Sequence, residues 1–284
     1  MEEKILTLSE YSLIDFVELV NEIFKDYVLP INWNVLSFKM DARENSVSLT
    51  DSFIFVKDKN PVGFILVAIR GNRARIDAMG VVEGERGKGL AERILKHTFH
   101  HLKHKNIETV YLEVAASDER AVRFYDKNGF RKHRELHTFI LKKPEPKNIR
   151  YSTFTSDNKY VYSVALNNEI DIQRKVNWQR EPITLLLADG RYNFTRFHVG
   201  NTEGYLVWGK NEDNSAFIVD LAVKSNSITD WEMVCNCAID YLYKELNPSL
   251  ISVVSVPEDD YLHTALENSG FEKVFTQYEM CRKI

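Results

Sequence analysis

A glycine-rich loop carries the clearest chemical signal in the sequence. The run Arg86-Gly87-Lys88-Gly89-Leu90-Ala91 follows a β-rich stretch and opens an amphipathic helix. Glycines let the backbone come close to a ligand because no side chain intervenes. The first turn of a helix presents unpaired N–H groups and a partial positive charge, to which Arg86 and Lys88 add full charges. The loop therefore predicts an anion site suited to a pyrophosphate.

Two common nucleotide-binding motifs do not describe this loop. The Walker pattern Gly-x-x-x-x-Gly-Lys-Ser/Thr is absent, and Glu92 stands where the dinucleotide fingerprint requires its third glycine. By physical reasoning alone the loop is a phosphate cradle. The alternative is a flexible turn before a solvated helix.

The elements around the loop alternate between helical and β-rich stretches. Gly129 ends one of these helices as a C-terminal glycine cap. The order mixes hairpins with a βαβ crossover, which is typical of an α+β fold. Periodicity predicts helices over about 9–27, 34–43, 87–104 and 119–128, and strands over 52–57, 62–70, 75–82, 109–115 and 137–141.

The second half of the chain repeats this order weakly. Its last helix ends at Gly270-Phe271. The corresponding helix of the first half ends at Gly129-Phe130, about half a chain length earlier. That spacing is expected of a duplicated domain. A polar segment with two prolines, 142–148, reads as an interdomain spacer. We therefore predict a first domain at 1–142, a linker at 143–150 and a second domain at 151–284.

Composition excludes several classes of protein. The 284 residues are 44% apolar and 27% charged with a net charge of −4, which gives no global basic field for nucleic acid or an anionic membrane. No stretch approaches the ~20 apolar residues of a membrane span, and the first residues lack the layout of a secretion signal. Three cysteines suit a reducing compartment, so we expect a cytoplasmic protein. Cys235 and Cys237 read as small buried residues, and no metal site is predicted.

Two clusters of ionisable residues read as surface features. The turn at residues 70–75 carries three arginines, which we expect at an exposed hairpin tip. One side of the 87–104 helix carries four histidines, which we expect on a solvated polar face: His97, His100, His101 and His104.

Two motifs in the first half resemble signatures of the GCN5-related N-acetyltransferase (GNAT) family. The run from Arg86 to Ala91 is similar to the family's Arg/Gln-x-x-Gly-x-Gly/Ala motif. The run from Asp118 to Phe130 resembles its Asn-x-x-Ala-x-x-Phe/Leu-Tyr-x-x-x-Gly-Phe signature. The resemblance covers about residues 1–142, and over the second half it rests on element order and the final Gly-Phe. It implies two tandem acyl-CoA N-acyltransferase (GNAT) domains, each a mixed, mostly antiparallel sheet flanked by helices.

The resemblance implies acetyl-CoA as co-substrate. Central strands of the family splay around the pantetheine arm, so the backbone of residues 79–81 would pair with that arm. The pyrophosphate would lie on the N–H groups of the glycine-rich loop. The implied cofactor-binding residues are Met79, Gly80, Val81, Arg86, Gly87, Lys88, Gly89, Leu90, Ala91, Glu92, Asp118 and Tyr125.

The implied reaction is direct transfer of acetyl to a primary amine, and the first half has no cysteine to form a covalent intermediate. A lysine-like amine, with a pKa of about 10.4, must lose a proton before it attacks a thioester. Alternation places Glu113 on one strand face with Thr109 and Tyr111, which makes it the predicted general base. Asp77 on the neighbouring strand and a water chain are the alternatives. The resemblance assigns Tyr125 as the acid that protonates the departing thiolate.

The second half departs from the pattern of the first. Its corresponding loop, from Lys224 to Trp231, has no glycine, and Asp230 would repel a phosphate. Leu266 stands where Tyr125 stands in the first half. We expect this half not to bind CoA and instead to stabilise the fold or to supply a wall of the acceptor site.

Within the first half, Asp118 replaces the family's asparagine; it still accepts hydrogen bonds and caps a helix, but it donates no amide N–H. The predicted function is an acetyl-CoA-dependent N-acetyltransferase acting on a small-molecule or peptide amine. A non-catalytic acyl-CoA-binding sensor or scaffold is the alternative. A transferase that takes a charged tRNA is disfavoured by the net charge of −4. No motif names the acceptor or the oligomeric state.

Overall fold

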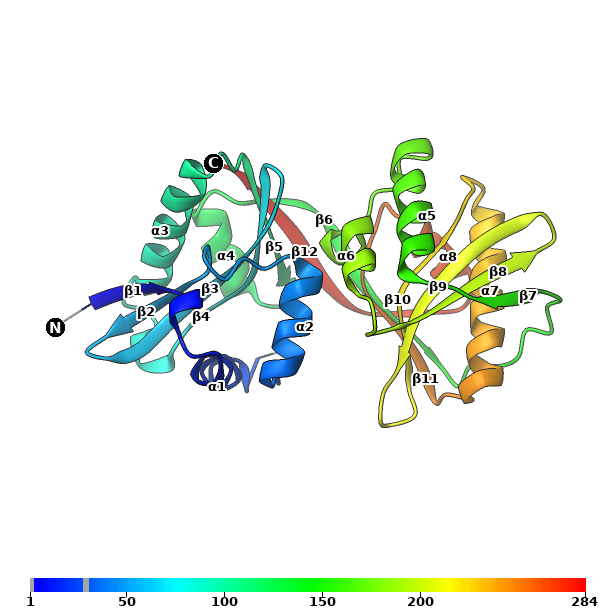
Figure 1. The fold of residues 1–284 in the computed structure, drawn as a ribbon, viewed down its shortest axis with the longest axis horizontal. Coiled ribbons are helices and arrows are strands. Elements are labelled where there is room, and N and C mark those ends of the chain that lie inside the picture. Colours follow the sequence, from blue (N-terminus) through cyan, green and yellow to red (C-terminus); the bar gives the residue numbers. More distant parts are fainter. Residues whose placement is uncertain (1–2, 28–30) are drawn as a thin grey trace. The chain divides into compact units, whose positions relative to one another are not determined.

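The computed structural model describes residues 3–27 and 31–284, drawn in Figure 1. The chain forms two compact units. Unit 1 comprises the residues up to His133 together with Tyr278–Ile284, and unit 2 comprises Arg134–Gln277. None of the helices in the described ranges is long and apolar enough to cross a membrane.

The two units exchange their last strands. Strand β6 (Arg131–Lys142) continues from unit 1 into unit 2, where it pairs with β11 (Leu250–Pro257). Strand β12 (Glu272–Lys283), red in Figure 1, begins in unit 2 and ends in unit 1. The units therefore differ from the ranges 1–142 and 151–284 expected from the sequence. A polar linker shows where the chain is exposed, but not which sheet a strand joins.

The strands of unit 1 that precede β6 follow the sheet order β1-β2-β3-β4-β5. Neighbouring strands are antiparallel except β4 and β5, which are parallel. This mixed, mostly antiparallel sheet with flanking helices confirms the predicted α+β class. The elements are β1 (Glu3–Thr7), α1 (Leu13–Phe24), α2 (Val35–Asn45), β2 (Phe53–Lys57), β3 (Asn60–Arg70), β4 (Arg73–Val81), α3 (Leu90–His104), β5 (Thr109–Ala115) and α4 (Glu119–Lys127).

Helices cover both faces of the unit 1 sheet. Helices α1 and α2 pack on one face, where the rings of Phe16, Phe38 and Phe64 meet at centroid distances of 5.1 and 5.4 Å. Helices α3 and α4 pack on the other face around a separate apolar cluster. The side chains of Ser12 and Asn34 accept hydrogen bonds from the first turns of α1 and α2, which fixes where these helices begin.

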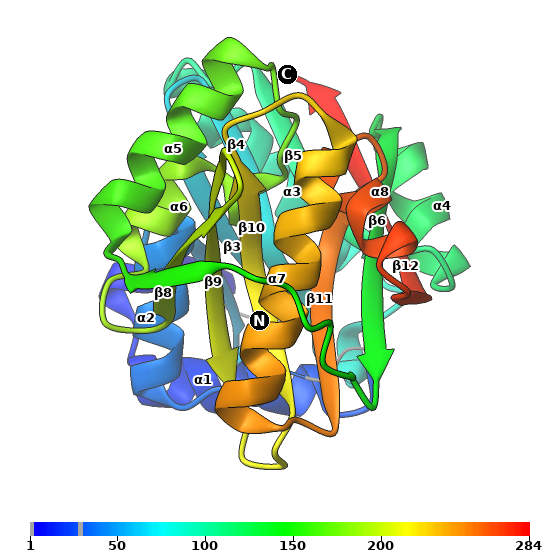
Figure 2. The same cartoon turned by 90° about the vertical axis from the view of Figure 1, so that its right-hand side faces the viewer.

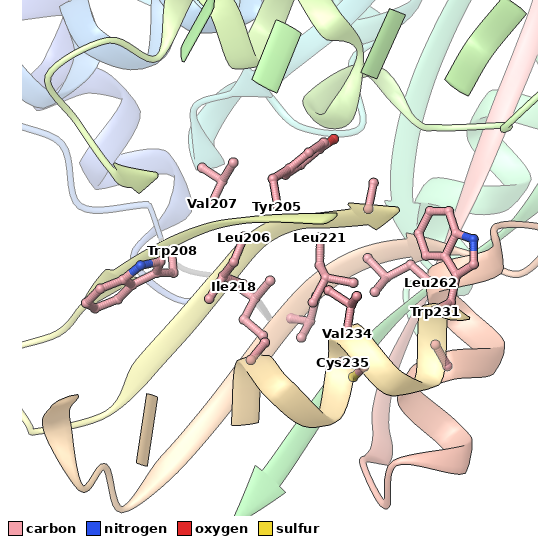
Figure 3. Close-up of a cluster of buried hydrophobic side chains, with 14 of the residues drawn as sticks. Tyr205, Leu206, Val207, Trp208, Ile218, Leu221, Trp231, Val234, Cys235 and Leu262 are labelled. Carbon is pink, nitrogen blue, oxygen red and sulfur yellow. The ribbon is translucent and has the colours of Figure 1, made fainter. Parts of the chain in front are cut away.

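Unit 2 repeats the order of unit 1, with a sheet in the order β6-β11-β10-β9-β8-β7. Helix α7 covers one face, and α5 and α6 cover the other (Figures 1 and 2). Leu206 and Leu221 point toward α7, whereas Tyr205 and Val207 point to the opposite face (Figure 3). The elements not yet given are β7 (Ser152–Thr155), α5 (Asn158–Asp171), α6 (Pro182–Leu187), β8 (Asn193–Val199), β9 (Thr202–Lys210), β10 (Ala216–Val223), α7 (Ile228–Leu246) and α8 (Tyr261–Asn268).

The strand registers match the two units residue by residue. The parallel pairing of β4 with β5 ends at Ile76 and Leu112, and that of β10 with β11 ends at Ile218 and Val253. Strands β4 and β10 each have a bulge directly after the last of these paired residues. The β3–β4 register skips residue 77, and the β9–β10 register skips residue 219. The predicted internal repeat therefore extends to the point where the central strands separate.

Candidate functional site

The glycine loop (residues 84–89) presents bare backbone in front of helix α3. Gly87 and Gly89 have φ values of +76° and +81°, in the left-handed region that glycine tolerates. A Cβ atom built on either glycine would meet nothing within 4 Å. Gly89 is the N-cap of α3 and has no side chain to accept from the first-turn amides of Leu90, Ala91 and Glu92. The first turn of α3 therefore lies behind backbone that no side chain covers.

The two predicted cations of the loop lie differently. The Arg86 side chain folds back toward β4, and its Nε donates to the carbonyl oxygen of Val81 at 3.1 Å. Lys88 is mostly exposed, with its Nζ 3.5 Å from Glu85, a carboxylate that Lys57 also contacts at 3.0 Å. Arg86 therefore anchors the end of β4, while Lys88 can turn toward an anion at little cost.

Strand β4 offers an unpaired edge next to this loop. Within the described chain, its ladder with β5 stops at Ile76, although β4 continues to Val81 and stays paired with β3. Met79, Gly80 and Val81, which the sequence analysis expects to pair with pantetheine, lie in this last part of the strand. Gly80 also has a packing role, because a Cβ there would lie 2.7 Å from Ile23.

Tyr125 lies on α4, on the side that faces the α3 core. Its ring contacts Phe124 and Phe130 at centroid distances of 5.3 and 5.6 Å. Burial is the main cause that raises the pKa of Tyr125 well above its usual value, and nearby Tyr27 and Asp118 add to it. The hydroxyl therefore stays protonated at neutral pH, as a proton donor must.

Asp118 joins Tyr125 to a residue that the sequence analysis missed. Its Oδ1 accepts from the N–H of Ala121 at 3.0 Å and so caps α4. The carboxylate also accepts a hydrogen bond from Tyr27, whose pKa is raised, first by burial and then by Asp118. Asp118 thus caps α4 and accepts a hydrogen bond from a tyrosine. Tyr27 follows α1 and is distant in sequence, so no spacing pattern pointed to it.

A polar trio occupies the point where β4 and β5 separate. Arg75 lies 3.3 Å from Asp77 (Nη1 to Oδ1) and 4.0 Å from Glu113 (Nη2 to Oε2). All three side chains are at most 10% exposed. The sequence analysis expected Arg75 at an exposed hairpin tip, and this expectation is wrong. Alternation along β4 turns its side chain inward, toward the face that α2 covers. The trio brings both predicted general-base candidates into one cluster.

Helix α2 adds polar groups to the same face. The Arg75 Nη1 donates to Asn45 Oδ1 at 3.5 Å. Asp41 accepts from the indole Nε1 of Trp33 at 2.6 Å, and its charge acts on Asp77. Burial raises the pKa of Asp77, Arg75 opposes this, and Asp41 and Glu113 add to it.

Unit 2 has apolar residues where unit 1 has the polar trio. By register, Phe217, Val219 and Val254 correspond to Arg75, Asp77 and Glu113. The counterpart of Tyr125, Leu266, is fully buried. The groups proposed for proton transfer in unit 1 therefore have no polar counterparts in unit 2.

Large side chains fill the corresponding region of unit 2. Arg174 is held between Asp220 and Asp260 with N–O distances of 2.8 to 3.0 Å, and all three side chains are at most 1% exposed. The guanidinium also lies 4.9 Å from the ring of Trp231, which stacks on Tyr261 at 5.5 Å. Figure 3 shows Trp231 at the start of α7, beside Leu262. The space between the first turns of α7 and α8 is thus occupied by protein.

The histidines of α3 are engaged in protein contacts. His101 Nε2 lies 2.6 Å from Asp51 Oδ1, and the ring of His97 packs edge-on to Phe53 at 4.6 Å. Burial lowers the pKa of His97. Among the residues that the structure describes, no group of three or more His, Cys, Asp or Glu side chains is placed to hold a metal ion.

Comparisons with known proteins point to one family. Residues 16–130 match the family model described as the acetyltransferase (GNAT) family. A GCN5-related N-acetyltransferase from Sphaerobacter thermophilus is 13% identical, with 99% of this chain and 95% of that chain covered and a TM-score of 0.67. A tandem GNAT protein from the clavulanic acid biosynthesis pathway is also 13% identical, with 99% and 98% covered and a TM-score of 0.69.

A GCN5-related N-acetyltransferase from Anabaena variabilis ATCC 29413 is 12% identical, with 99% of this chain and 72% of that chain covered and a TM-score of 0.64. A search of curated proteins gave no match. The structural likeness at these identities shows the fold, and the family match shows which unit carries the motifs. Residues 16–130 are thus similar to the acetyltransferase (GNAT) family, and the chain as a whole shares the two-unit fold of these GNAT structures.

Proposed function

We propose that the protein transfers an acetyl group from acetyl-CoA to a primary amine, with the chemistry confined to unit 1. One observation carries this proposal: the uncapped first turn of α3 and its left-handed glycines lie beside the unpaired end of β4. This arrangement suits a ligand with a diphosphate and an extended amide arm. We expect the protein to act in the cytoplasm and to need no metal.

Acetyl-CoA would supply the acetyl thioester, and the residues of unit 1 would bind it at two places. Backbone groups of residues 79–81 would pair with the amide arm. The amides of residues 87–92 would hold the diphosphate, with Lys88 as a mobile counter-charge. Asp118 and Tyr125 would lie at the reacting end. Asp118 caps the α4 helix that carries Tyr125.

Two proton transfers are required of the protein. The acceptor amine arrives as an ammonium ion, and Glu113 or Asp77 would take its proton so that the nitrogen lone pair can attack the thioester carbon. The carbon–sulfur bond then breaks, and Tyr125 would donate its proton to the departing sulfur. Burial raises the pKa of Tyr125, so its hydroxyl is protonated when the substrate binds.

We propose that unit 2 does not bind CoA. The buried Arg174 cluster and the Trp231–Tyr261 stack fill the region that corresponds to the cofactor site, and the loop before α7 lacks glycine. A charged group buried with tight partners is costly to displace. Unit 2 would therefore serve the fold and not the chemistry.

An amine screen tests the activity and the acceptor together. The protein is incubated with acetyl-CoA and a library of small amines and peptides, and released thiol is measured. We expect acceptor-dependent thiol release with a subset of amines. Tight binding of acetyl-CoA with no release for any amine would favour the acyl-CoA sensor instead. Release that prefers a longer acyl-CoA would contradict acetyl specificity.

Replacing Gly89 with valine should weaken acetyl-CoA binding at least several-fold. Valine at a φ of +81° is strained, so the loop must change shape at the point where its amides meet the diphosphate. Isothermal titration calorimetry measures the affinity, and it should show one site per wild-type chain. Gly71→Val is the matched control, because Gly71 is also left-handed with open space but lies in the β3–β4 turn. Equal loss in both variants, or two equivalent wild-type sites, would contradict the assignment.

A further inference from the structure

The chain contains two clusters in which one arginine faces two carboxylates, and they differ in tightness. In unit 2, Arg174 bonds Asp220 and Asp260 at 2.8 to 3.0 Å, the range of strong charge-assisted hydrogen bonds. In unit 1, Arg75 lies 3.3 Å from Asp77 and 4.0 Å from Glu113. The Arg174 cluster is held by short charge-assisted hydrogen bonds, whereas the Arg75 cluster has longer N–O distances.

Asp77 lies at a β-bulge in strand β4. The bulge in β4 inserts Asp77 as an extra residue that the β3 register skips, and bulges re-aim a side chain. It follows directly after Ile76, the last residue of β4 that pairs with β5. Asp77 therefore stands at the beginning of the strand edge proposed to receive the amide arm.

The Arg75 guanidinium is only partly satisfied by its neighbours. Its side chain is 9% exposed, and its Nε is buried with no hydrogen-bond partner among the described residues. A buried N–H group without a hydrogen-bond partner reduces stability. Packing alone would therefore not favour an arginine at position 75. Phe217, the register counterpart in unit 2, shows that an apolar ring fits this strand position.

Four charged groups act on Asp77 from the elements around it. Arg75 on the same strand and Arg70 at the end of β3 favour its ionised form. Glu113 on β5 and Asp41 on α2 disfavour it, as does burial, which is the largest influence. Arg75 is the larger of the two cationic influences, so it is the main group that opposes the effect of burial on Asp77.

We propose that Asp77 is the carboxylate that takes the proton from the incoming amine, and that Arg75 is a positioning residue that holds Asp77 ionised beside Glu113 until the amine arrives. This proposal rests on the proposed acetyltransferase function. The ammonium proton passes to Asp77, and the amine nitrogen keeps the electron pair with which it attacks. Protonation neutralises the Asp77 carboxylate, so the positive charge that the amine loses remains on the protein as the Arg75 guanidinium, which Asp77 no longer compensates.

Titration of the Asp77 carboxyl tests the role of Arg75 without any acceptor. The full chain is labelled with ¹³C at aspartate carboxyls, and the Asp77 signal is assigned by its loss in Asp77→Asn. In Arg75→Gln, the pKa of Asp77 should rise by roughly 1 to 3 pH units, because an opposite charge has been removed. Arg75→Lys keeps the charge and should restore most of the wild-type titration. An unchanged titration in Arg75→Gln would overturn the proposal.

A second variant keeps the test decisive if Arg75→Gln does not fold. Glu113→Gln removes a like charge, so the Asp77 pKa should fall; no change would show that the trio is not one electrostatic unit. Arg70→Gln is the matched control for Arg75→Gln and should move the titration less.

Kinetics with an amine from the screen complete the experiment. The acid limb of kcat/KM should move to higher pH in Arg75→Gln. At a fixed pH below the limb, activity should fall about tenfold for every pH unit that the limb moves. Asp77→Asn should abolish that limb, whereas Glu113→Gln should retain it. The reverse pattern would assign the base to Glu113. If no amine is acetylated, the proposed function fails, while the titration still decides the role of Arg75.

Discussion

Replacing Tyr125 with phenylalanine should lower kcat by about 10²- to 10⁴-fold, the range of a lost general acid. The dissociation constant for acetyl-CoA should change much less, because the ring keeps its contacts with Phe124 and Phe130. Only the hydroxyl is removed, and with it the proton for the departing sulfur. Steady-state kinetics with an amine from the screen, together with calorimetry, separate the two effects.

Tyr278→Phe is the matched control, because Tyr278 also packs partly buried against the α3 and α4 core. It should leave kcat near the wild-type value. Because burial keeps the pKa of Tyr125 raised, wild-type activity should show no alkaline limb from this residue through moderately alkaline pH. Equal losses of kcat and of CoA affinity in Tyr125→Phe would mean that the ring is needed only for packing.

A chain that ends at Gln277 should lose acetyl-CoA binding, although every residue proposed to contact CoA is retained. Residues 278–284 belong to unit 1. Met280 is 3% exposed in the α3 and α4 core. Arg282 donates to the carbonyl oxygen of Asn128 and lies 4.3 Å from the ring of Phe99. Without these contacts, α3 and α4 lose part of the surface that holds them, so the glycine loop and Tyr125 lose their support.

Point variants give the same test a graded form. Met280→Ala should reduce the free energy of unfolding by about 2 to 5 kcal/mol, as is typical when a buried methionine is truncated. Cys281→Ala is the neighbouring control at a half-buried position and should cost less. Urea denaturation followed by tryptophan fluorescence and calorimetry with acetyl-CoA measure both properties. Normal CoA binding by the shortened chain would show that unit 1 is complete without β12.

The local elements of unit 1 were predictable because they rest on short-range patterns. Apolar spacing indicated α1 and α3, and the glycine loop was recognised from residue types that a phosphate site needs. Helix α3 begins at Leu90 rather than near 87, since Gly87 and Gly89 have left-handed backbones. Strand β1 was not predicted, because five residues at an edge carry little periodic signal.

The site itself depends on contacts that no local pattern encodes. In the sequence, Arg75 belongs to a cluster of arginines at a turn. Its proximity to Glu113 depends on the pairing of β4 with β5, the next strand of the sheet. Tyr27 meets Asp118 only because α1 and α4 are folded against one sheet. The strand exchange could not be predicted either. The hydrophobic pattern of β6 and β12 would be the same whichever unit each strand joined.

That exchange has a consequence for how the protein is made. Translation delivers the glycine loop, the polar trio and Tyr125 early, but residues 278–284, which complete the core around them, only after all of unit 2. The first half can therefore complete its core only after the second half has been synthesised. Chaperone dependence and co-translational aggregation should accordingly respond to translation speed through unit 2, a region proposed to have no chemistry of its own.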